Sequence, residues 1–258
     1  MRLTIVGSAG SVAGPDSAAS CYLIEADAAG RTWSLVLDLG SGAIGPLQRY
    51  TDPSRLDAVV ISHGHADHCA DLGALSVLRR YGPDREAALP RIALFGPHGL
   101  DRRILEISGD AGGDDLSVFD YTALQHGARI SLGPFDITAA RAYHPVPALA
   151  YRIEGPSPYQ GRASVVFTGD TDRCAEVDAL ALGCDLLLGE AGWAHRLENP
   201  PGIHMNGDGL GHLAAASGAA KVVVTHIASW VPTAQTMQQV HAHVPGAALA
   251  QPGQVYEV

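Results

Sequence analysis

Residues 63–68 read His-Gly-His-Ala-Asp-His and directly follow the short apolar run Asp-Ala-Val-Val-Ile-Ser at 57–62. Neutral imidazole nitrogens and carboxylate oxygens are ligands that Zn²⁺ and similar metals prefer. The continuous β-branched run before them is typical of a buried strand, and a helix is predicted over 70–80. The ligand cluster therefore stands at the carboxyl end of a strand, where open α/β sheets place their functional sites.

Length and composition favour one large α/β domain spanning residues 1–258. The chain is 47% hydrophobic and 17% charged, which is enough apolar material for a sizeable core. The net charge is −10 and Lys221 is the only lysine, which disfavours a broad polyanion such as tRNA as a partner. The four cysteines form no C-x-x-C pair, so we expect a protein with reduced thiols.

The first residues, M-R-L-T-I-V-G, are too short a run for the apolar core of a secretory signal. No apolar run approaches the roughly 20 residues that a membrane-spanning helix needs. We therefore expect a cytoplasmic protein without a membrane partner.

The pattern of apolar and turn residues predicts strands first and strand–helix alternation later in each half of the chain. Strands are expected at 3–6, 21–25, 33–39, 58–62, 91–95, 129–132, 136–140, 148–154, 164–168, 185–189 and 221–225, with two short ones around Pro252–Gly253. Helices are expected at 42–50, 70–80, 99–107, 171–182, 207–217 and 233–243. This order predicts two sheets packed face to face with helices outside them.

More ligand candidates follow apolar strands in the same way as the 63–68 cluster. His144 ends one such run, Asp170 follows another and opens a predicted helix, and His226 ends a third. His204 lies in the segment P-P-G-I-H-M-N-G at 200–207. The repeated placement at strand ends predicts that these side chains converge on one site.

Taken together, S-H-G-H-A-D-H at 62–68, His144, T-G-D-T at 168–171 and T-H at 225–226 resemble the metallo-β-lactamase superfamily. The order of these motifs matches over essentially the whole chain. The resemblance implies an α/β fold, the αβ/βα sandwich of two mixed β-sheets with helices on the outer faces.

The resemblance also implies two divalent metal ions as cofactors, held by seven side chains. His63, His65 and His144 would hold one ion, Asp67, His68 and His226 the other, and Asp170 would bridge them. Zn²⁺ is the first choice, and Mn²⁺ and Fe²⁺ are alternatives because no thiolate in the set excludes harder ions. The residues implied to be catalytic are Asp67, His204 and Glu190.

Within the superfamily, the chain is most similar to the ribonuclease Z-like branch, and there to actinobacterial cyclic-nucleotide phosphodiesterases. The similarity rests on G-S-A-G-S-V-A-G-P at 7–15, D-L-G-S-G at 38–42 and S-H-G-H-A-D-H-C-A-D-L at 62–72. It implies hydrolysis of a small 3′,5′-cyclic nucleotide, cyclic AMP first, to the 5′-monophosphate. His204 would protonate the leaving oxygen and Glu190 would orient it, although Glu190 could equally be a solvated strand end.

The alternative within this branch is a tRNA 3′-processing endonuclease. Resemblance to that enzyme calls for a long basic arm between His144 and Asp170, but only 25 residues with two arginines lie there. The arginine of its N-terminal loop is replaced by Ala18 or Ala19, and Met-Asn-Gly follows His204 instead of Ser-Thr. We therefore expect a small-molecule nucleotide as the partner and disfavour nucleic acid; a homodimer stays open.

Two further readings are weaker. A non-catalytic binding module is disfavoured because structural zinc sites are usually closed and rich in cysteine. Thioester hydrolysis lacks a specific signal, since Cys69-Ala70-Asp71 stands where glycines are usual in that family.

Some features have two readings. The loop Gly7–Gly14 would either offer backbone N–H groups to a phosphate or simply rim the site. Trp193 or Trp230 could stack on a purine, although core packing is favoured for both. The remaining histidines are expected to be ordinary surface or core residues: His98, His126, His195, His212, His241 and His243.

Overall fold

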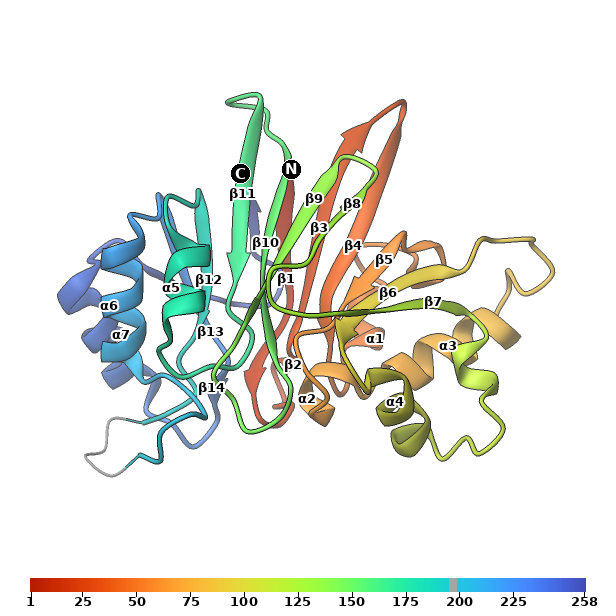
Figure 1. Cartoon of the computed structure of the whole chain (residues 1–258), viewed down its shortest axis with the longest axis horizontal. Coiled ribbons are helices and arrows are strands. Elements are labelled where there is room, and N and C mark those ends of the chain that lie inside the picture. Colours follow the sequence, from red (N-terminus) through yellow and green to blue (C-terminus); the bar gives the residue numbers. More distant parts are fainter. Residues whose placement is uncertain (195–198) are drawn as a thin grey trace.

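The computed structural model describes residues 1–194 and 199–258 and contains two mixed β-sheets (Figure 1). The first has nine strands, in the order β14-β1-β3-β4-β5-β6-β7, with β2 and β16 also paired to β1. Its strands are β1 (Arg2–Gly10), β2 (Ala18–Ala19), β3 (Cys21–Ala28), β4 (Arg31–Leu39), β5 (Ala58–Val60), β6 (Ile92–Pro97), β7 (Phe119–Leu124), β14 (Ile227–Ala228) and β16 (Val255–Glu257). From β4 to β7 all pairs are parallel, whereas β3 is antiparallel to β1 and β4.

The second sheet has seven strands in the order β15-β13-β12-β11-β10-β9-β8. Its strands are β8 (Arg129–Leu132), β9 (Phe135–Arg141), β10 (Leu149–Pro156), β11 (Arg162–Phe167), β12 (Leu186–Glu190), β13 (Lys221–Thr225) and β15 (Ala248–Leu249). β8 to β11 pair antiparallel and β11 to β15 pair parallel.

The two sheets bury one apolar core between them, because successive side chains of a strand point to opposite faces. In β3, Tyr22 and Ile24 enter this inner core, while Cys21 and Leu23 enter a second core on the outer face. Both faces are buried, which explains why these strands are apolar without alternation in polarity.

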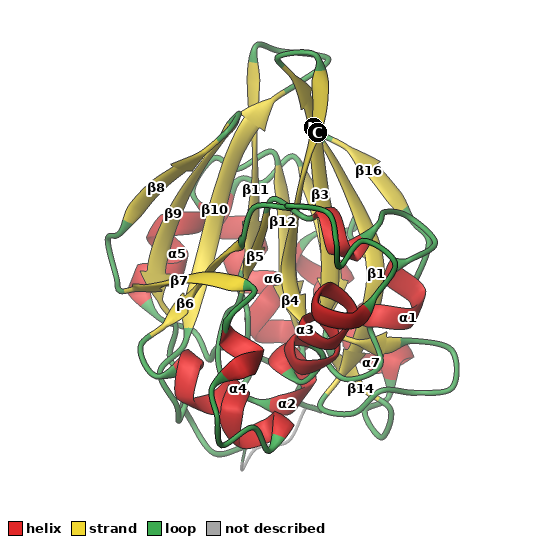
Figure 2. Ribbon diagram, turned by 90° about the vertical axis from the view of Figure 1, so that its right-hand side faces the viewer, coloured by secondary structure: helices red, strands yellow, loops and turns green. Residues whose placement is uncertain are grey.

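Helices cover the outer face of each sheet, as Figures 1 and 2 show. On the first sheet they are α1 (Ile44–Leu47), α2 (Ala66–Cys69), α3 (Leu72–Tyr81) and α4 (Leu100–Ser108), with short 3₁₀ turns at Pro53–Arg55 and Asp114–Leu116. On the second they are α5 (Ala175–Ala181), α6 (Gly207–Ser217) and α7 (Thr233–His243). The sandwich predicted from the sequence is confirmed.

Two helix boundaries differ from the prediction. The helix expected at 171–182 begins at Ala175, because Thr171 is held in a loop: its N–H donates to Glu190 and its hydroxyl accepts from Tyr143 N. Asp170 therefore lies in a loop and does not open a helix. The segment after His65 forms a separate short helix, α2, which is broken before α3 where Asp71 accepts hydrogen bonds from the backbone near α1.

Strand β7 was not predicted from the sequence. Its residues F-D-Y-T-A-L bury only Phe119 and Leu124, so the segment lacks the continuous apolar run of the other parallel strands. It lies at the edge of the sheet, where one side needs no neighbouring strand. No helix within residues 1–194 and 199–258 is long and apolar enough to cross a membrane.

Candidate metal centre

The predicted ligands come from loops at one end of the sandwich. β5 leads into His63, β9 into His144, β11 into Asp170 and β13 into His226. The two sheets meet at this end, because His63 forms a bridge to Ala148 at the start of β10. Strand ends from both halves of the chain thus bring the side chains together.

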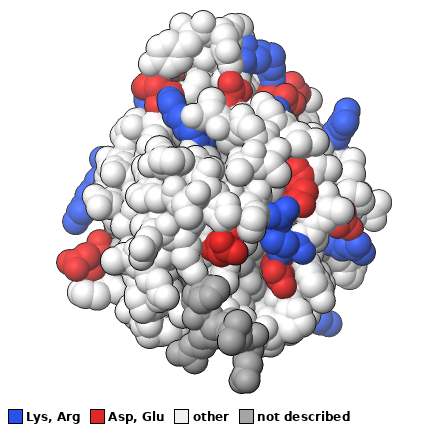
Figure 3. Space-filling model, turned by 90° about the vertical axis from the view of Figure 1, so that its left-hand side faces the viewer, with Lys and Arg blue, Asp and Glu red and all other residues white. Residues whose placement is uncertain are grey.

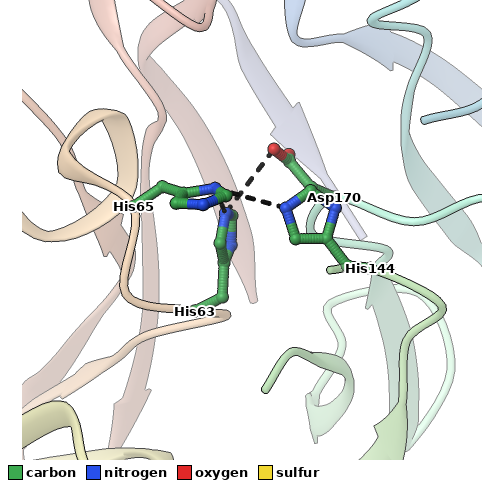
Figure 4. A group of neighbouring side chains, drawn as sticks. All are labelled: His63, His65, His144 and Asp170. Atoms are coloured by element: carbon green, nitrogen blue, oxygen red, sulfur yellow. Dashed lines mark hydrogen bonds and ion pairs between the residues drawn. The ribbon is translucent and has the colours of Figure 1, made fainter. Parts of the chain in front are cut away.

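One group consists of His63, His65, His144 and Asp170, whose ligand atoms all lie within 4.8 Å of one another (Figure 4). His65 Nδ1 is 2.9 Å from His63 Nε2 and 3.2 Å from His144 Nε2. Figure 4 shows the first two imidazoles on one side and the other two residues on the opposite side, all directed toward a common point. The arrangement suits one metal ion with three nitrogen ligands and one oxygen ligand.

A second group consists of Asp67, His68, His226 and the same Asp170. His68 Nε2 lies 3.1 Å from His226 Nε2, and both nitrogens lie 3.2–3.3 Å from Asp67 Oδ2. Asp170 Oδ2 is 3.3 Å from His68 Nε2, and its Oδ1 is 3.4 Å from His226 Nε2. Asp170 is therefore common to two ligand groups that lie side by side.

The surroundings of Asp170 test whether this site fits metal ions. The residue is 2% exposed, and its Oδ1 is buried without a hydrogen-bond partner among the described residues. A buried carboxylate oxygen is costly unless it has a hydrogen bond or a cation. Bare imidazole nitrogens and carboxylates facing each other at about 3 Å form a set that divalent cations stabilise, so the residues fit the cofactor.

The protonation states fit for the first group, whereas in the second group burial of His68 is outweighed by the carboxylates of Asp170 and Asp38, which raise its pKa, so a cation there has to displace a proton. Burial lowers the pKa of His63, His65 and His144, so these imidazoles are neutral near pH 7, the form that binds metal. Burial alone would raise the pKa of Asp67 and Asp170, but the neighbouring histidines outweigh it and hold both below the ordinary range. Both carboxylates are therefore ionised.

Asp38 supports this centre and was not singled out by the sequence analysis as a functional residue. It is fully buried at the end of β4 and accepts hydrogen bonds from Ser62 N and Ser62 Oγ. Its Oδ2 lies 2.6 Å from His68 Nδ1, so it fixes the ring whose Nε2 faces the second group. Its φ of 55° is unusual for a residue other than glycine. An aspartate that ends an apolar strand, in the D-L-G motif, is the only signal in the sequence.

Replacing Asp38 by Asn tests this positioning role, because asparagine keeps the shape and tolerates the left-handed backbone. We expect zinc affinity to fall by roughly 10–100-fold, since the carboxylate no longer orients His68. Competition with a chromophoric chelator measures this, and Asp120→Asn on the exposed side of β7 is the control. Unchanged zinc affinity in a folded Asp38→Asn protein would contradict the role.

Glu190 and His204 form a pair beside the two groups. Glu190 is fully buried at the end of β12 and accepts backbone hydrogen bonds from Thr171, Gly192 and Met205. Its Oε1 lies 3.1 Å from His204 Nδ1. Burial lowers the pKa of His204, but the charge of Glu190 and its hydrogen bond outweigh burial and raise it to about 9. The solvated strand end considered for Glu190 is thus excluded.

His204 lies close to the ligands as well. Its Nδ1 is 3.8 Å from Asp170 Oδ2, and its ring centre is 5.4 Å from that of His226. Glu190, His204 and His226 even form a third group with metal-ligand spacing. His204 Nδ1 is already engaged by Glu190 Oε1 at 3.1 Å, and with the raised pKa this contact favours an imidazole that carries a proton.

The two tryptophans differ from each other. Trp193 packs edge-on against His204, with ring centres 5.5 Å apart and an interplanar angle of 83°. Trp230 is 63% exposed, so the expectation that it packs in the core is wrong.

Two glycines of the 7–14 segment allow the backbone to pack closely. A Cβ on Gly7 would lie 2.1 Å from Ala19 O, and one on Gly10 would lie 2.3 Å from His226 O.

Two histidines that were expected to be ordinary surface or core residues, His212 and His243, contact each other away from this centre. His243 Nε2 lies 2.8 Å from Asp208 Oδ1, and His212 stacks on His243 with ring centres 4.2 Å apart. The group bridges α6 and α7 at the surface, where His212 is 61% exposed in its side chain. His195 lies outside the described residues.

Two mixed sheets with outer helices, and a buried histidine–aspartate cluster at their strand ends, define a metal-dependent hydrolase of the αβ/βα sandwich class. The family described as the beta-lactamase superfamily domain matches residues 35–227. The chain belongs to this family.

Similarity to whole proteins supports this family assignment. Rv1339 of Mycobacterium tuberculosis (strain ATCC 25618 / H37Rv) is 38% identical over 249 residues, covering 95% of this chain and 88% of that protein. The probable metallo-hydrolase YhfI of Bacillus subtilis (strain 168) is 29% identical over 230 residues, covering 88% and 87%. The crystal structure of YhfI, described as a metallo-beta-lactamase fold protein, superposes with a TM-score of 0.85 at 25% identity and covers 100% of this chain and 99% of that one. A ribonuclease Z of Mycobacterium bovis (strain BCG / Pasteur 1173P2) is 29% identical over 212 residues, covering 73% of this chain and 69% of that protein.

Proposed function

We propose that this protein is a dinuclear metal-dependent phosphodiesterase that hydrolyses a small 3′,5′-cyclic nucleotide, cyclic AMP first, to the 5′-monophosphate. The observation that carries this proposal is the position of Asp170, which belongs to two ligand groups at once and lies next to His204. Zn²⁺ is the first candidate for both ions, with Mn²⁺ and Fe²⁺ as alternatives, because the ligands are imidazoles and carboxylates.

Two divalent cations, when bound, supply Lewis acidity and lower the pKa of a water toward about 7. The protein's own residues provide the rest. His63, His65 and His144 are neutral, and the charges of Asp67 and Asp170 would balance those of the cations. Asp38 keeps the ring of His68 in one orientation.

His204 supplies the proton for the leaving 3′ oxygen. With a pKa raised to about 9 it holds that proton at neutral pH. Glu190 binds Nδ1, so Nε2 is the ring nitrogen not engaged in this bond and the one assigned to the substrate. Such a positioned acid contributes typically about 10²–10⁴-fold to a rate.

The shape of the second half favours a small substrate. Between His144 and Asp170 the chain forms only β10 and β11, joined by a short loop at 157–161. There is no room in this described segment for a protruding basic arm that would hold a tRNA. On the face of Figure 3, over the helices of the second sheet, basic side chains are scattered among acidic ones and form no stripe on its described part. Polyanion binding depends on clustered cations.

A product screen of the zinc-loaded protein tests the function. Cyclic mononucleotides, cyclic dinucleotides and a tRNA precursor are compared under the same conditions, and products are separated by chromatography. We expect cyclic AMP to give 5′-AMP with the highest kcat/KM. Faster cleavage of the tRNA precursor would instead support the endonuclease, which the similarity to ribonuclease Z makes the second candidate. Tight nucleotide binding without turnover would indicate a binding module.

A further inference from the structure

A cavity of about 350 Å³ opens next to the first ligand group. We call it the His65 pocket, because the side chain of His65 belongs both to its wall and to the ligand group. The other walls come from Pro97–Leu100, where β6 leads into α4, and from Val146 and Pro147, two and three residues after His144. The pocket therefore adjoins the first ligand group through His65.

The walls of the His65 pocket are apolar on two sides. Pro97 and Leu100 form one side and are both buried, and Val146 with Pro147 forms the other. Two apolar sides favour a flat hydrophobic group, since burying its apolar faces stabilises the complex by roughly 25 cal/mol per Å² of surface removed from water. A bare ribose or a second phosphate gains little from such walls.

Arg103 adds a planar cation that is held firmly at the ligand loop. Its Nε donates to Gly64 O at 2.9 Å, and a Cβ on Gly64 would lie 3.3 Å from its Cγ. The absence of a side chain between the two ligand histidines thus lets the arginine stem pack over the loop. A guanidinium plane fixed in this way can stack on a heteroaromatic ring.

One carboxylate partly offsets the two arginine charges of the pocket. Glu106 Oε1 lies 3.5 Å from Arg102 Nε, and its Oε2 lies 3.5 Å from Arg103. Two guanidinium groups are thus partly neutralised by one carboxylate, and Arg102 is 83% exposed in its side chain.

We propose that the His65 pocket binds the nucleobase of the substrate, between the apolar walls and beside the Arg103 plane. The inference rests on the proposed function, because it takes a phosphate at the metal centre as its starting point. This proposal places the base away from both tryptophans, since neither Trp193 nor Trp230 is among the described residues that line the pocket. Base recognition then depends on α4 and on the segment that follows His144.

The experiment compares 5′-AMP with ribose 5-phosphate, which lacks the base, by calorimetric titration of the zinc-loaded protein. We expect 5′-AMP to bind at least about 10-fold more tightly. Val146→Trp fills the pocket, and we expect it to reduce the affinity for 5′-AMP to that for ribose 5-phosphate, with zinc content unchanged. Val77→Trp, at an exposed valine of α3, is the matched control. If Val146→Trp does not fold, Val146→Phe is used.

Equal affinity of the wild-type protein for the two ligands would overturn the inference. So would a Val146→Trp protein that keeps the preference for 5′-AMP, or one that loses affinity for both ligands equally. Turnover of cyclic AMP is measured in parallel. If turnover is absent but the preference for the base persists and is lost in Val146→Trp, the proposed reaction fails while the base pocket stands. If turnover is present without the preference, the pocket alone fails.

Discussion

Replacing Asp170 by Asn is expected to cause a large loss of activity, because Asp170 belongs to both ligand groups. The two residues have the same shape, so the change removes mainly the negative charge shared by both ligand groups. Loss of an outer partner of a metal ligand already costs about 10–100-fold, so loss of a shared ligand should exceed 100-fold in kcat/KM. Zinc content, measured by atomic absorption after gel filtration, should fall below that of the wild type.

A thermal shift provides a readout that does not depend on the substrate. Zinc that binds the folded state stabilises it by an amount that grows with the logarithm of its affinity, so Tm should rise with zinc in the wild type and rise much less in Asp170→Asn. Asp136→Asn is the matched control, because Asp136 is an exposed aspartate that pairs with Arg162 on the second sheet. Equal zinc content and equal Tm shifts in wild type and Asp170→Asn would refute the shared-ligand role.

His204→Ala is expected to lower kcat by about 10²–10⁴-fold while zinc content stays unchanged. The reason is loss of the proton donor and not loss of a ligand. An activated leaving group needs little protonation, so hydrolysis of bis(p-nitrophenyl) phosphate should lose far less activity than hydrolysis of cyclic AMP. Measured loss of zinc in His204→Ala would instead make it a ligand in the third group with Glu190 and His226.

The pH dependence of activity distinguishes the roles of His204 and Glu190. Because the pKa of His204 is raised to about 9, the acid is protonated below that pH, and activity should fall as pH rises through it. Bound cations disfavour the charged ring, so the alkaline limb is expected at or below this value. Glu190→Gln removes the charge that raises the pKa, and the limb should move to lower pH. An unmoved limb would mean that another group carries the proton.

Much of the architecture could be predicted from the chain alone because the central strands of both sheets are apolar on both faces. The run at 57–62 and the run ending at Thr225 are of this kind, and both were placed within a few residues of β5 and β13. Strand β7 was missed since an edge strand buries few side chains. The predicted start of α5 was wrong because a hydrogen bond from Thr171 N to Glu190 and one from Tyr143 N to the Thr171 hydroxyl hold Thr171 in a loop.

The candidate ligands could be identified from residue type and position, since metals select imidazole and carboxylate and the sheet gathers strand ends at one edge. The positioning residue Asp38 could not. Asp38 is an ordinary aspartate in the sequence, and only its burial and its 2.6 Å contact with His68 show its role. Similarly, nothing near Val146 in the sequence indicates that it lines a cavity together with Leu100.

What the sequence determined by itself is the set of groups able to bind metal and the layered fold that presents them, because both follow from side-chain chemistry and local periodicity. What only the tertiary structure decided is which atoms meet. The sharing of Asp170 between two groups, the raised pKa of His204 beside Glu190 and the pocket at His65 all depend on contacts between residues far apart in the chain. Distances of about 3 Å between such residues are fixed by the packing of the two sheets, and no local pattern encodes them.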